Sequence, residues 1–463
     1  MIKNQRLAPQ EKSIWIDRVM YLLFGVYLCY YFWDTPHFGD DLYIFFDMKE
    51  NYTLWEYTVM RYETWSSRQI IEVVLYYIVH WKPLWAILSG LIAVTCCKLL
   101  ANFQDDPQPK AWLCISVFWL YPMSEMYSAG WIAATTNYLW VLLFLMTNLL
   151  LLGKVIRGHA YSKSFYILQL FAMTYATNQE QSAALHFGSF LLGTAYVFFS
   201  EHKIMKKLGL SPQKPYDIPK EMKRLLPFLL FSFVMVVYHL TCPGNEVRTE
   251  LHGGIFFPRH SELALWQHLE LGITFTLFWF MFQYYQIIVP LFVLVMLLGL
   301  EKNNKKALFS LGIMPCALLG LFYFLSNPSH GVTYEQLIPG ILTDASNTIM
   351  IISDNPSLLI PNLLIFVSFL GFNGALCLVC QDRKKSFLVF VLIMAGFLSR
   401  VIMGFSPTVL ISRNRTYMFM LFAYMLIILE LYRQLVETKN KPAIAIGAGV
   451  IVLTGFCSFI FTY

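Results

Sequence analysis

Long apolar runs recur along the whole chain and constrain its fold more than any other feature. Of the 463 residues, 57% are hydrophobic and only 13% are charged, whereas soluble domains carry about 25% charged residues. An α-helix needs about 20 apolar residues to cross a hydrocarbon layer. A membrane β-barrel would instead show alternating segments of about ten residues. The sequence therefore predicts an all-α polytopic membrane protein that forms a single transmembrane domain over residues 1–463.

About 13 of these runs are expected to form transmembrane helices. The first lies at 14–33 and lacks a small-residue cleavage site, so we expect it to remain as a span rather than to act as a removable signal. The other expected spans are 84–102, 111–123, 137–152, 165–177, 184–199, 225–241, 273–300, 308–325, 359–380, 387–404, 416–433 and 443–462.

Basic residues are distributed unevenly between the expected loops. The N-terminal tail, the loop 200–224 and other alternate loops hold most of the 34 Lys and Arg residues. The positive-inside rule places these loops and the N-terminus in the cytoplasm. We interpret 200–224 as a basic cytoplasmic loop near anionic headgroups rather than as a partner-binding segment. The net charge of +6 therefore reflects topology, and no nucleic-acid partner is expected.

Two adjacent carboxylates stand a few residues after the first apolar run. Asp40 and Asp41 lie in the stretch 38–43, which reads FGDDLY. Two neighbouring negative charges bring no structural advantage, so we interpret them as catalytic residues, with a solvated loop turn as the alternative. A carboxylate can accept a proton as a general base, and the pair could also share one proton or hold a divalent cation. The sequence does not decide between these roles or say which Asp is the base.

The residues between the first two expected spans form a long first extracellular loop, 34–83. Apolar and aromatic residues recur near helical period from Trp55 to Trp65, with charged residues between them. This pattern predicts a helix that lies in the membrane interface. The apolar stretch 70–81 that follows is too short to span the membrane.

Polar residues also gather at five further outer turns or span ends, beside aromatic residues. Because polar groups at membrane depth are costly and usually mark function, we expect them to line one cavity that opens outward. The expected cavity-lining residues are Asn137, Tyr138, Glu180, Asn245 and His330.

Several arginines are expected at the same outer level. The planar guanidinium group matches the oxygens of a phosphate, so these side chains are candidates for binding the phosphate of a lipid-linked donor. Energy for a reaction outside the cell has to travel with the substrate, and a polyprenyl-phosphate sugar meets that need. The candidates for binding the donor phosphate are Arg413, Arg415 and Arg248, followed by Arg68 and Arg400.

An ordered set of short motifs carries a family resemblance over most of the chain. The motifs are FGDDLY at 38–43, WSSR at 65–68, NYLW at 137–140, NQEQ at 178–181, PGNEVR at 243–248 and SPTVLISRNR at 406–415. Together they resemble the GT-C superfamily of integral-membrane glycosyltransferases, and more narrowly a group of bacterial GT-C-like proteins linked to the decoration of cell-wall or surface polysaccharides.

The resemblance implies a GT-C-like fold in the bacterial plasma membrane, with the active site on the outer face. It implies a polyprenyl-phosphate sugar, such as an undecaprenyl-phosphate sugar, as donor and a glycan as acceptor. It carries the role of base or metal ligand onto Asp40 or Asp41, and phosphate binding onto Arg413 or Arg415. No obligatory cofactor is expected, a divalent cation remains possible, and Asp40 and Asp41 are the candidate metal ligands. The chain lacks a large C-terminal soluble domain, which favours monosaccharide donors.

Two other functions remain open. A lipid-linked-glycan flippase or transporter would place ionisable groups near the membrane midplane and often contains internal repeats. The sequence places its polar groups at one face and has no obvious repeat. A polysaccharide polymerase also acts outside, but an acidic pair in the first loop fits it less well. The absence of GxxxxGK[ST] and GxGxxG motifs argues against nucleotide chemistry on the cytoplasmic side.

Overall fold

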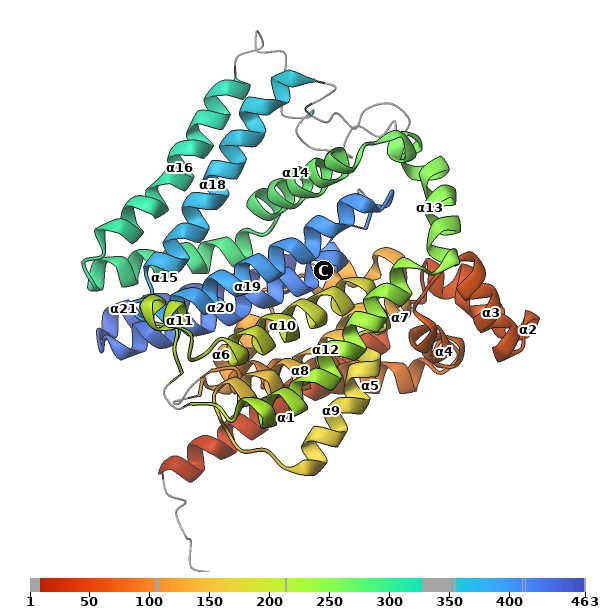
Figure 1. Cartoon of the computed structure of the whole chain (residues 1–463), viewed down its shortest axis with the longest axis horizontal. Helices are drawn as coiled ribbons and strands as arrows, with labels where there is room; N and C mark the ends of the chain where they lie inside the picture. The colour runs from red at the N-terminus through yellow and green to blue at the C-terminus, as the bar shows by residue number, and fades with distance from the viewer. Residues whose placement is uncertain are drawn as a thin grey trace, which may run out of the picture.

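The computed structural model describes residues 9–104, 108–212, 215–326, 352, 355–409, 411–412 and 414–461. All regular secondary structure in these residues is helical, which confirms the expected all-α class. Figure 1 shows the C-terminal helices, in blue, crossing the middle of the molecule. The short helices of the first loop, in red and orange, gather at one end of it.

Eight of the described helices are long and apolar enough to cross a membrane, and the bent pair α14 (Leu265–Gln283) and α15 (Tyr285–Glu301), with 75° between its halves, makes up to nine. The chain is therefore a polytopic membrane protein. The eight spans are Lys82–Asn102 (α5), Trp131–Ile156 (α7 to α8), Ile218–Leu240 (α12), Lys305–Leu325 (α16), Pro356–Leu378 (η6 and α18), Arg383–Phe405 (α19 and η7), Arg415–Glu437 (η8 and α20) and Lys441–Ile460 (α21). The α20 span is 89% buried, and it forms the centre of the core.

The expected number of about 13 spans is not confirmed by length and composition. Helix α1 (Pro9–Asp34) and helix α10 (Glu180–Phe198) have 26 and 19 residues but are not among the eight. Helix α9 (Lys163–Ala176) has 14 residues. The expected span 111–123 is corrected, because α6 (Ala111–Phe118) ends after eight residues. The chain then turns at Pro122, which disfavours helix in the residue before it.

Four short helices lie between α1 and α5. They are η1 (Asp41–Phe46), α2 (Met48–Asn51), α3 (Leu54–Thr64) and α4 (Gln69–Ile78). The helix expected at Trp55–Trp65 is therefore confirmed as α3. A capping box fixes its start, because the Thr53 side chain accepts from the backbone of Glu56, whose side chain accepts from the backbone of Thr53. With ten residues, α4 is too short to span.

The loop expected at 200–224 is partly helical. It contains α11 (Lys203–Leu208), and α12 begins at Ile218. Asp217 caps α12 by accepting a hydrogen bond from the backbone of Lys220, and Pro219 occupies its first turn. The last seven residues of the expected loop therefore belong to a helix.

Helix α13 (Pro243–Phe256) and the turn η4 (Pro258–Glu262) connect α12 to α14. The start of α13 presses against the end of α3, since a Cβ atom on Gly244 would lie 2.5 Å from the backbone nitrogen of Trp65. Figure 1 shows α13 rising from the end of the molecule where α2, α3 and α4 lie. This packing brings the PGNEVR motif onto the first loop.

Candidate functional site

The side chain of Asp41 caps the N-terminal end of the span Trp131–Ile156. Its side chain is 0% exposed, and its two oxygens accept hydrogen bonds from the backbone nitrogens of Ile132, at 2.9 Å, and Ala133, at 2.8 Å. The first N–H groups of a helix have no partner within the helix, and a negative charge is favourable there. Burial raises the pKa of Asp41 to about 7, although these two N–H groups lower it. Asp41 is therefore fully engaged as a helix cap.

Asp40 lies beside it with a free carboxylate. Its side chain is half-buried, and no hydrogen bond or ion pair from the described residues reaches it. Burial raises the pKa of Asp40 above the ordinary value, while the nearby charges of Arg415 and Arg61 act to lower it. The adjacent aspartates thus have different roles: Asp41 holds the backbone, and Asp40 is available to accept a proton.

Arg415 lies close enough to Asp40 for its positive charge to act on the carboxylate. It is half-buried, and its Nη1 atom donates to the Ser128 hydroxyl oxygen at 3.3 Å. No ion pair joins it to a carboxylate of the described residues. The described residues therefore leave most of the donors of Arg415 without a partner. Arg413 and His330, which the sequence also proposed for the site, lie outside the described residues.

A buried ion pair lies close enough to Asp40 to act on its charge. Arg61 on α3 donates from Nε and Nη2 to the two carboxylate oxygens of Glu72 on α4, each at 3.0 Å. The Tyr57 hydroxyl donates to the same carboxylate at 2.5 Å. Sequence reasoning missed this pair. One signal was present, because Glu72 is the only charged residue in the apolar stretch Gln69–Ile78.

A second ion pair joins the first loop to the start of α10. Arg68 donates from Nε to Glu180 at 2.7 Å and from Nη1 to the Asn137 side-chain oxygen at 2.8 Å. Arg248 lies 3.7 Å from the same carboxylate. Burial alone would raise the pKa of Glu180, but Arg68 and Arg248 lower it to about 2. Glu180 is therefore ionised at any physiological pH, and Arg68 is committed to it.

A chain of hydrogen bonds fixes the position of Arg248. Its Nη2 atom donates to the side-chain oxygen of Asn245 at 3.1 Å, and the Asn245 amide donates to the His239 carbonyl at 2.7 Å. The His239 ring bridges the Ser67 hydroxyl, at 2.7 Å, and the Thr177 carbonyl, at 2.9 Å. Because a carbonyl only accepts, the nitrogen facing Thr177 carries the proton and Ser67 donates to the other. The motifs WSSR, NQEQ and PGNEVR are thus linked.

The two ion pairs and Asp40 lie in one region. Arg61 is close enough to act on the charges of both Asp40 and Arg248. Burial lowers the pKa of His252, and the charges of Arg248 and Arg415 lower it further. Tyr138, which is buried, interacts electrostatically with Arg68 and Arg248. Apart from Asp41, this region holds four arginines and three carboxylates. They are Arg61, Arg68, Arg248 and Arg415, and Asp40, Glu72 and Glu180. The region can therefore attract an anion.

Arg400 does not join this cluster. It lies at the end of α19, where its guanidinium group stacks on the ring of Tyr417 at 4.6 Å and its Nη2 atom donates to the Val409 carbonyl at 3.3 Å. No ion pair joins it to a carboxylate of the described chain. The sequence placed Arg400 with the other arginines, but the structure surrounds it with different neighbours.

The role of the two aspartates as cation ligands stays a prediction. Both oxygens of Asp41 face backbone N–H groups, which repel a cation. Within the described ranges, no group of three or more His, Cys, Asp or Glu side chains is placed to hold a metal ion. No step proposed below passes through a cation.

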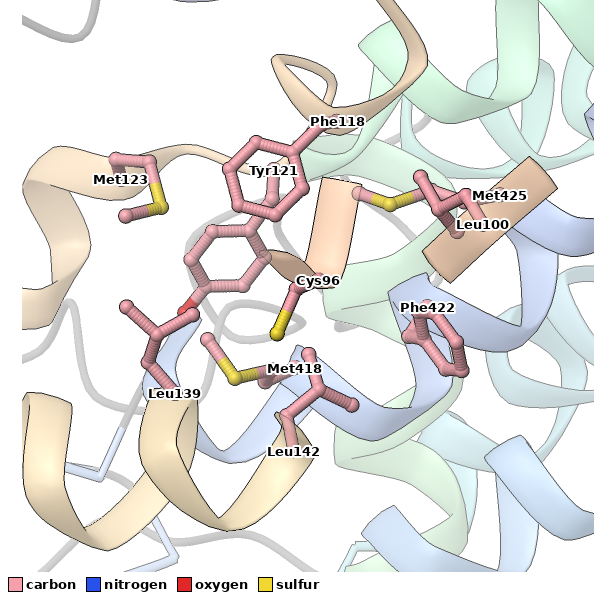
Figure 2. Close-up of a pocket in the computed structure, with 10 residues that line it drawn as sticks. All are labelled: Cys96, Leu100, Phe118, Tyr121, Met123, Leu139, Leu142, Met418, Phe422 and Met425. Carbon is pink, nitrogen blue, oxygen red and sulfur yellow. The ribbon is translucent and has the colours of Figure 1, made fainter. Parts of the chain in front are cut away.

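A small apolar cavity lies apart from these charges. Figure 2 shows the side chains that line it, which come from α5, α6, the turn and the helix η2 (Met123–Ala129) that follow α6, the α7 to α8 span and α20. Its free volume is about 20 Å³, which is room for about one water molecule. The lining residues are Cys96, Leu100, Phe118, Tyr121, Met123, Leu139, Leu142, Met418, Phe422 and Met425. None of the residues that the sequence proposed for the site lines it.

Comparison of the whole chain with protein-family models, with curated proteins and with solved structures found no match. The functional argument therefore depends on the geometry of the residues described above.

The ion pair of Arg68 and Glu180 gives a direct prediction about stability. Their side chains are 19% and 25% exposed, so removing one partner leaves a mostly buried charge. Arg68→Met alone is expected to lower the free energy of unfolding by about 2 kcal/mol, and clearly less when Glu180→Gln is already present. A double-mutant cycle from unfolding in detergent measures the difference. Strictly additive effects of the two substitutions would contradict the pairing.

Proposed function

We propose that this protein is a GT-C-like membrane glycosyltransferase that acts on the outer face of the bacterial plasma membrane. It would move one monosaccharide from a polyprenyl-phosphate donor, such as an undecaprenyl-phosphate sugar, to a cell-wall or surface polysaccharide. The observation that carries the proposal is the carboxylate of Asp40, which no described residue bonds, which is close enough to Arg415 and Arg61 to feel their charges, and which has a raised pKa.

Asp40 is the base in this proposal. The acceptor hydroxyl oxygen attacks the anomeric carbon of the donor sugar, and its proton passes to a carboxylate oxygen of Asp40. The bond between the anomeric carbon and the phosphate oxygen breaks, and the electron pair leaves with the polyprenyl phosphate. A carboxylate whose pKa is raised by burial is a better proton acceptor than a solvated one. A single base and a direct displacement favour inversion of configuration.

Arg415 and Arg248 stabilise the leaving phosphate in this proposal. Among the described residues, Arg415 has one hydrogen bond, to Ser128, and its remaining donors can turn to phosphate oxygens. Arg248 contacts Glu180 only at 3.7 Å and is held by Asn245. Fixed positive charge near a developing negative charge lowers the barrier without reorganisation during the reaction. Arg68 instead positions Glu180, because its donors are already used.

The proposed topology keeps the N-terminus in the cytoplasm and about 13 passes through the membrane. Helices α1, α9 and α10 would join the up to nine spans found by composition, whereas α6 is too short to cross alone. This arrangement supports an outer location for Asp40, which follows the first span directly. It also leaves the basic segment at 200–224 in the cytoplasm.

Reconstitution tests this function against transport. Purified protein in liposomes receives labelled undecaprenyl-phosphate sugars and an envelope glycan fraction, and both product glycan and released undecaprenyl phosphate are measured. The proposal expects label in the glycan together with release of one undecaprenyl phosphate for each sugar transferred. Movement of the intact labelled lipid across the bilayer without cleavage would establish a flippase instead.

The dependence of the rate on pH should reveal Asp40. A base has to be ionised, so the rate rises with pH through the pKa of Asp40, which lies above the ordinary value of about 4. Arg415 lowers this pKa, so Arg415→Gln removes a stabilising charge and raises it further. The acid limb of the kcat profile should therefore move to higher pH in this variant. The exposed arginine variant Arg383→Gln should keep the wild-type profile, and an unmoved limb in Arg415→Gln would contradict the assignment.

A further inference from the structure

The guanidinium group of Arg400 is buried without enough partners. Its side chain is 1% exposed, and its Nη2 atom donates to the Val409 carbonyl at 3.3 Å. In the described part of the chain, Nε and Nη1 have no hydrogen-bond partner. A buried charge is stable only when it is paired or fully hydrogen-bonded. The observed neighbours of Arg400 therefore leave two charged donors to be satisfied by something else.

A second buried donor lies close to the same place. Thr276 on α14 is 0% exposed, and its hydroxyl oxygen has no hydrogen-bond partner among the described residues. The Tyr417 hydroxyl oxygen is close enough to Arg400 and Thr276 to take up part of their hydrogen-bonding capacity, and it donates its own proton to the Phe275 carbonyl at 3.1 Å. One oxygen cannot satisfy Nε and Nη1 of Arg400 and the Thr276 hydroxyl together. Tyr417 also stacks beneath the guanidinium group. Arg400 on α19 and Thr276 on α14 thus bring unsatisfied groups next to the same residue, Tyr417, at the end of the turn η8.

The surroundings favour an anion at this point. Leu271, Phe275 and Val409 belong to one buried apolar cluster around it, and a charge–charge attraction is stronger in such surroundings than in water. Unsatisfied donors from a guanidinium and a hydroxyl group match a negative ligand. Because both donor side chains are almost completely enclosed, the ligand has to be small.

We propose that Arg400 and Thr276, with Tyr417 as a wall, form a binding site for one small inorganic anion. The site is separate from the cluster of Asp40 and Arg415, since its donors come from α14 and α19 and contact none of the carboxylates of that cluster. Chloride and inorganic phosphate are the two candidate anions for this site. The proposal does not depend on the glycosyltransferase assignment.

The anion would hold together the segments that position Arg415. Gln181 on α10 donates to the carbonyl of Ser399, at 2.8 Å, and to that of Thr416, at 3.4 Å. These residues directly adjoin Arg400 and Arg415. An anion that bridges α14 and α19 would therefore stabilise the same junction between α19 and the segment that carries Arg415.

The test is the thermal stability of the purified full-length protein in detergent. Sodium chloride or sodium phosphate replaces sodium gluconate at constant ionic strength, and the melting temperature is followed by intrinsic fluorescence. Wild type and the control Arg383→Gln, an exposed arginine on the same helix, should show a saturable rise. Arg400→Gln should show none. Thr276→Val, which replaces the hydroxyl group by a methyl group, should raise the half-saturating anion concentration about tenfold.

Arg400→Met provides a second readout that survives if Arg400→Gln folds poorly. In gluconate this variant should melt above wild type, because it removes an uncompensated buried charge, and saturating chloride or phosphate should reduce or reverse the difference. The proposal is overturned if neither anion raises the wild-type melting temperature above that in gluconate, or if Arg400→Gln responds like wild type. It is also overturned if only undecaprenyl phosphate stabilises through Arg400, because the arginine would then belong to the donor site.

Discussion

Asp40→Asn is expected to reduce sugar transfer by on the order of 10³-fold, because general-base catalysis contributes factors of this size. Asn keeps the shape of the side chain but cannot accept the proton. No described residue bonds to the Asp40 carboxylate, so the substitution should leave the melting temperature nearly unchanged. The rate constant kcat for label transfer in proteoliposomes and the melting temperature of the same preparation test both parts.

Asp47→Asn is the matched control for this prediction. Asp47 is an exposed carboxylate six residues after Asp41, on the same segment of the first loop. Its replacement should leave both transfer and stability at wild-type values. A transfer rate for Asp40→Asn within a factor of ten of wild type would remove Asp40 from the role of base.

Gly130→Ala is expected to prevent accumulation of folded protein. Gly130 has φ +104°, and a Cβ atom there would lie 2.6 Å from Asp41 Oδ1 and 2.7 Å from the Phe38 carbonyl oxygen. The clash would displace the Asp41 cap and leave the N–H groups of Ile132 and Ala133 unsatisfied, at about 1–3 kcal/mol each. The strained φ adds about 1–3 kcal/mol. The monodisperse fraction after solubilisation and its melting temperature measure the loss.

Gly158→Ala separates the clash from the backbone strain. Gly158 also has a positive φ, of +68°, but a Cβ atom there would meet nothing within 4 Å. It should therefore cost only about 1 kcal/mol, from the left-handed backbone conformation. If the two alanine variants are equally stable, Asp41 does not depend on Gly130 and the account of the cap is wrong.

The sequence was sufficient for the features that depend on local pattern. Apolar runs of membrane length predicted the long helices, and the spacing from Trp55 to Trp65 predicted α3. The prediction of a span at 111–123 was wrong, because apolarity alone does not show that the helix ends and the chain turns before Pro122.

The functions of individual charged residues depended on distant contacts. The carboxylate of Asp41 meets backbone groups 91 and 92 residues further along the chain, and Arg68 meets Glu180 across 112 residues. Neither separation follows from a motif. For this reason the sequence pattern predicted the same catalytic role for Asp40 and Asp41 and a phosphate-binding role for Arg68. The three-dimensional contacts separate a capping Asp from a free one, and a paired arginine from Arg415.

The most direct test of the central claim is the sugar composition of the envelope polysaccharide in source cells that lack this protein and carry a plasmid copy. Mass spectrometry of the purified polysaccharide should find one sugar substituent missing without the protein. The substituent should return with the wild-type or Asp47→Asn copy and remain missing with Asp40→Asn, although both variants are present in the membrane at equal amounts. Full return of the sugar with Asp40→Asn, or an unchanged polysaccharide when the protein is absent, would contradict the account.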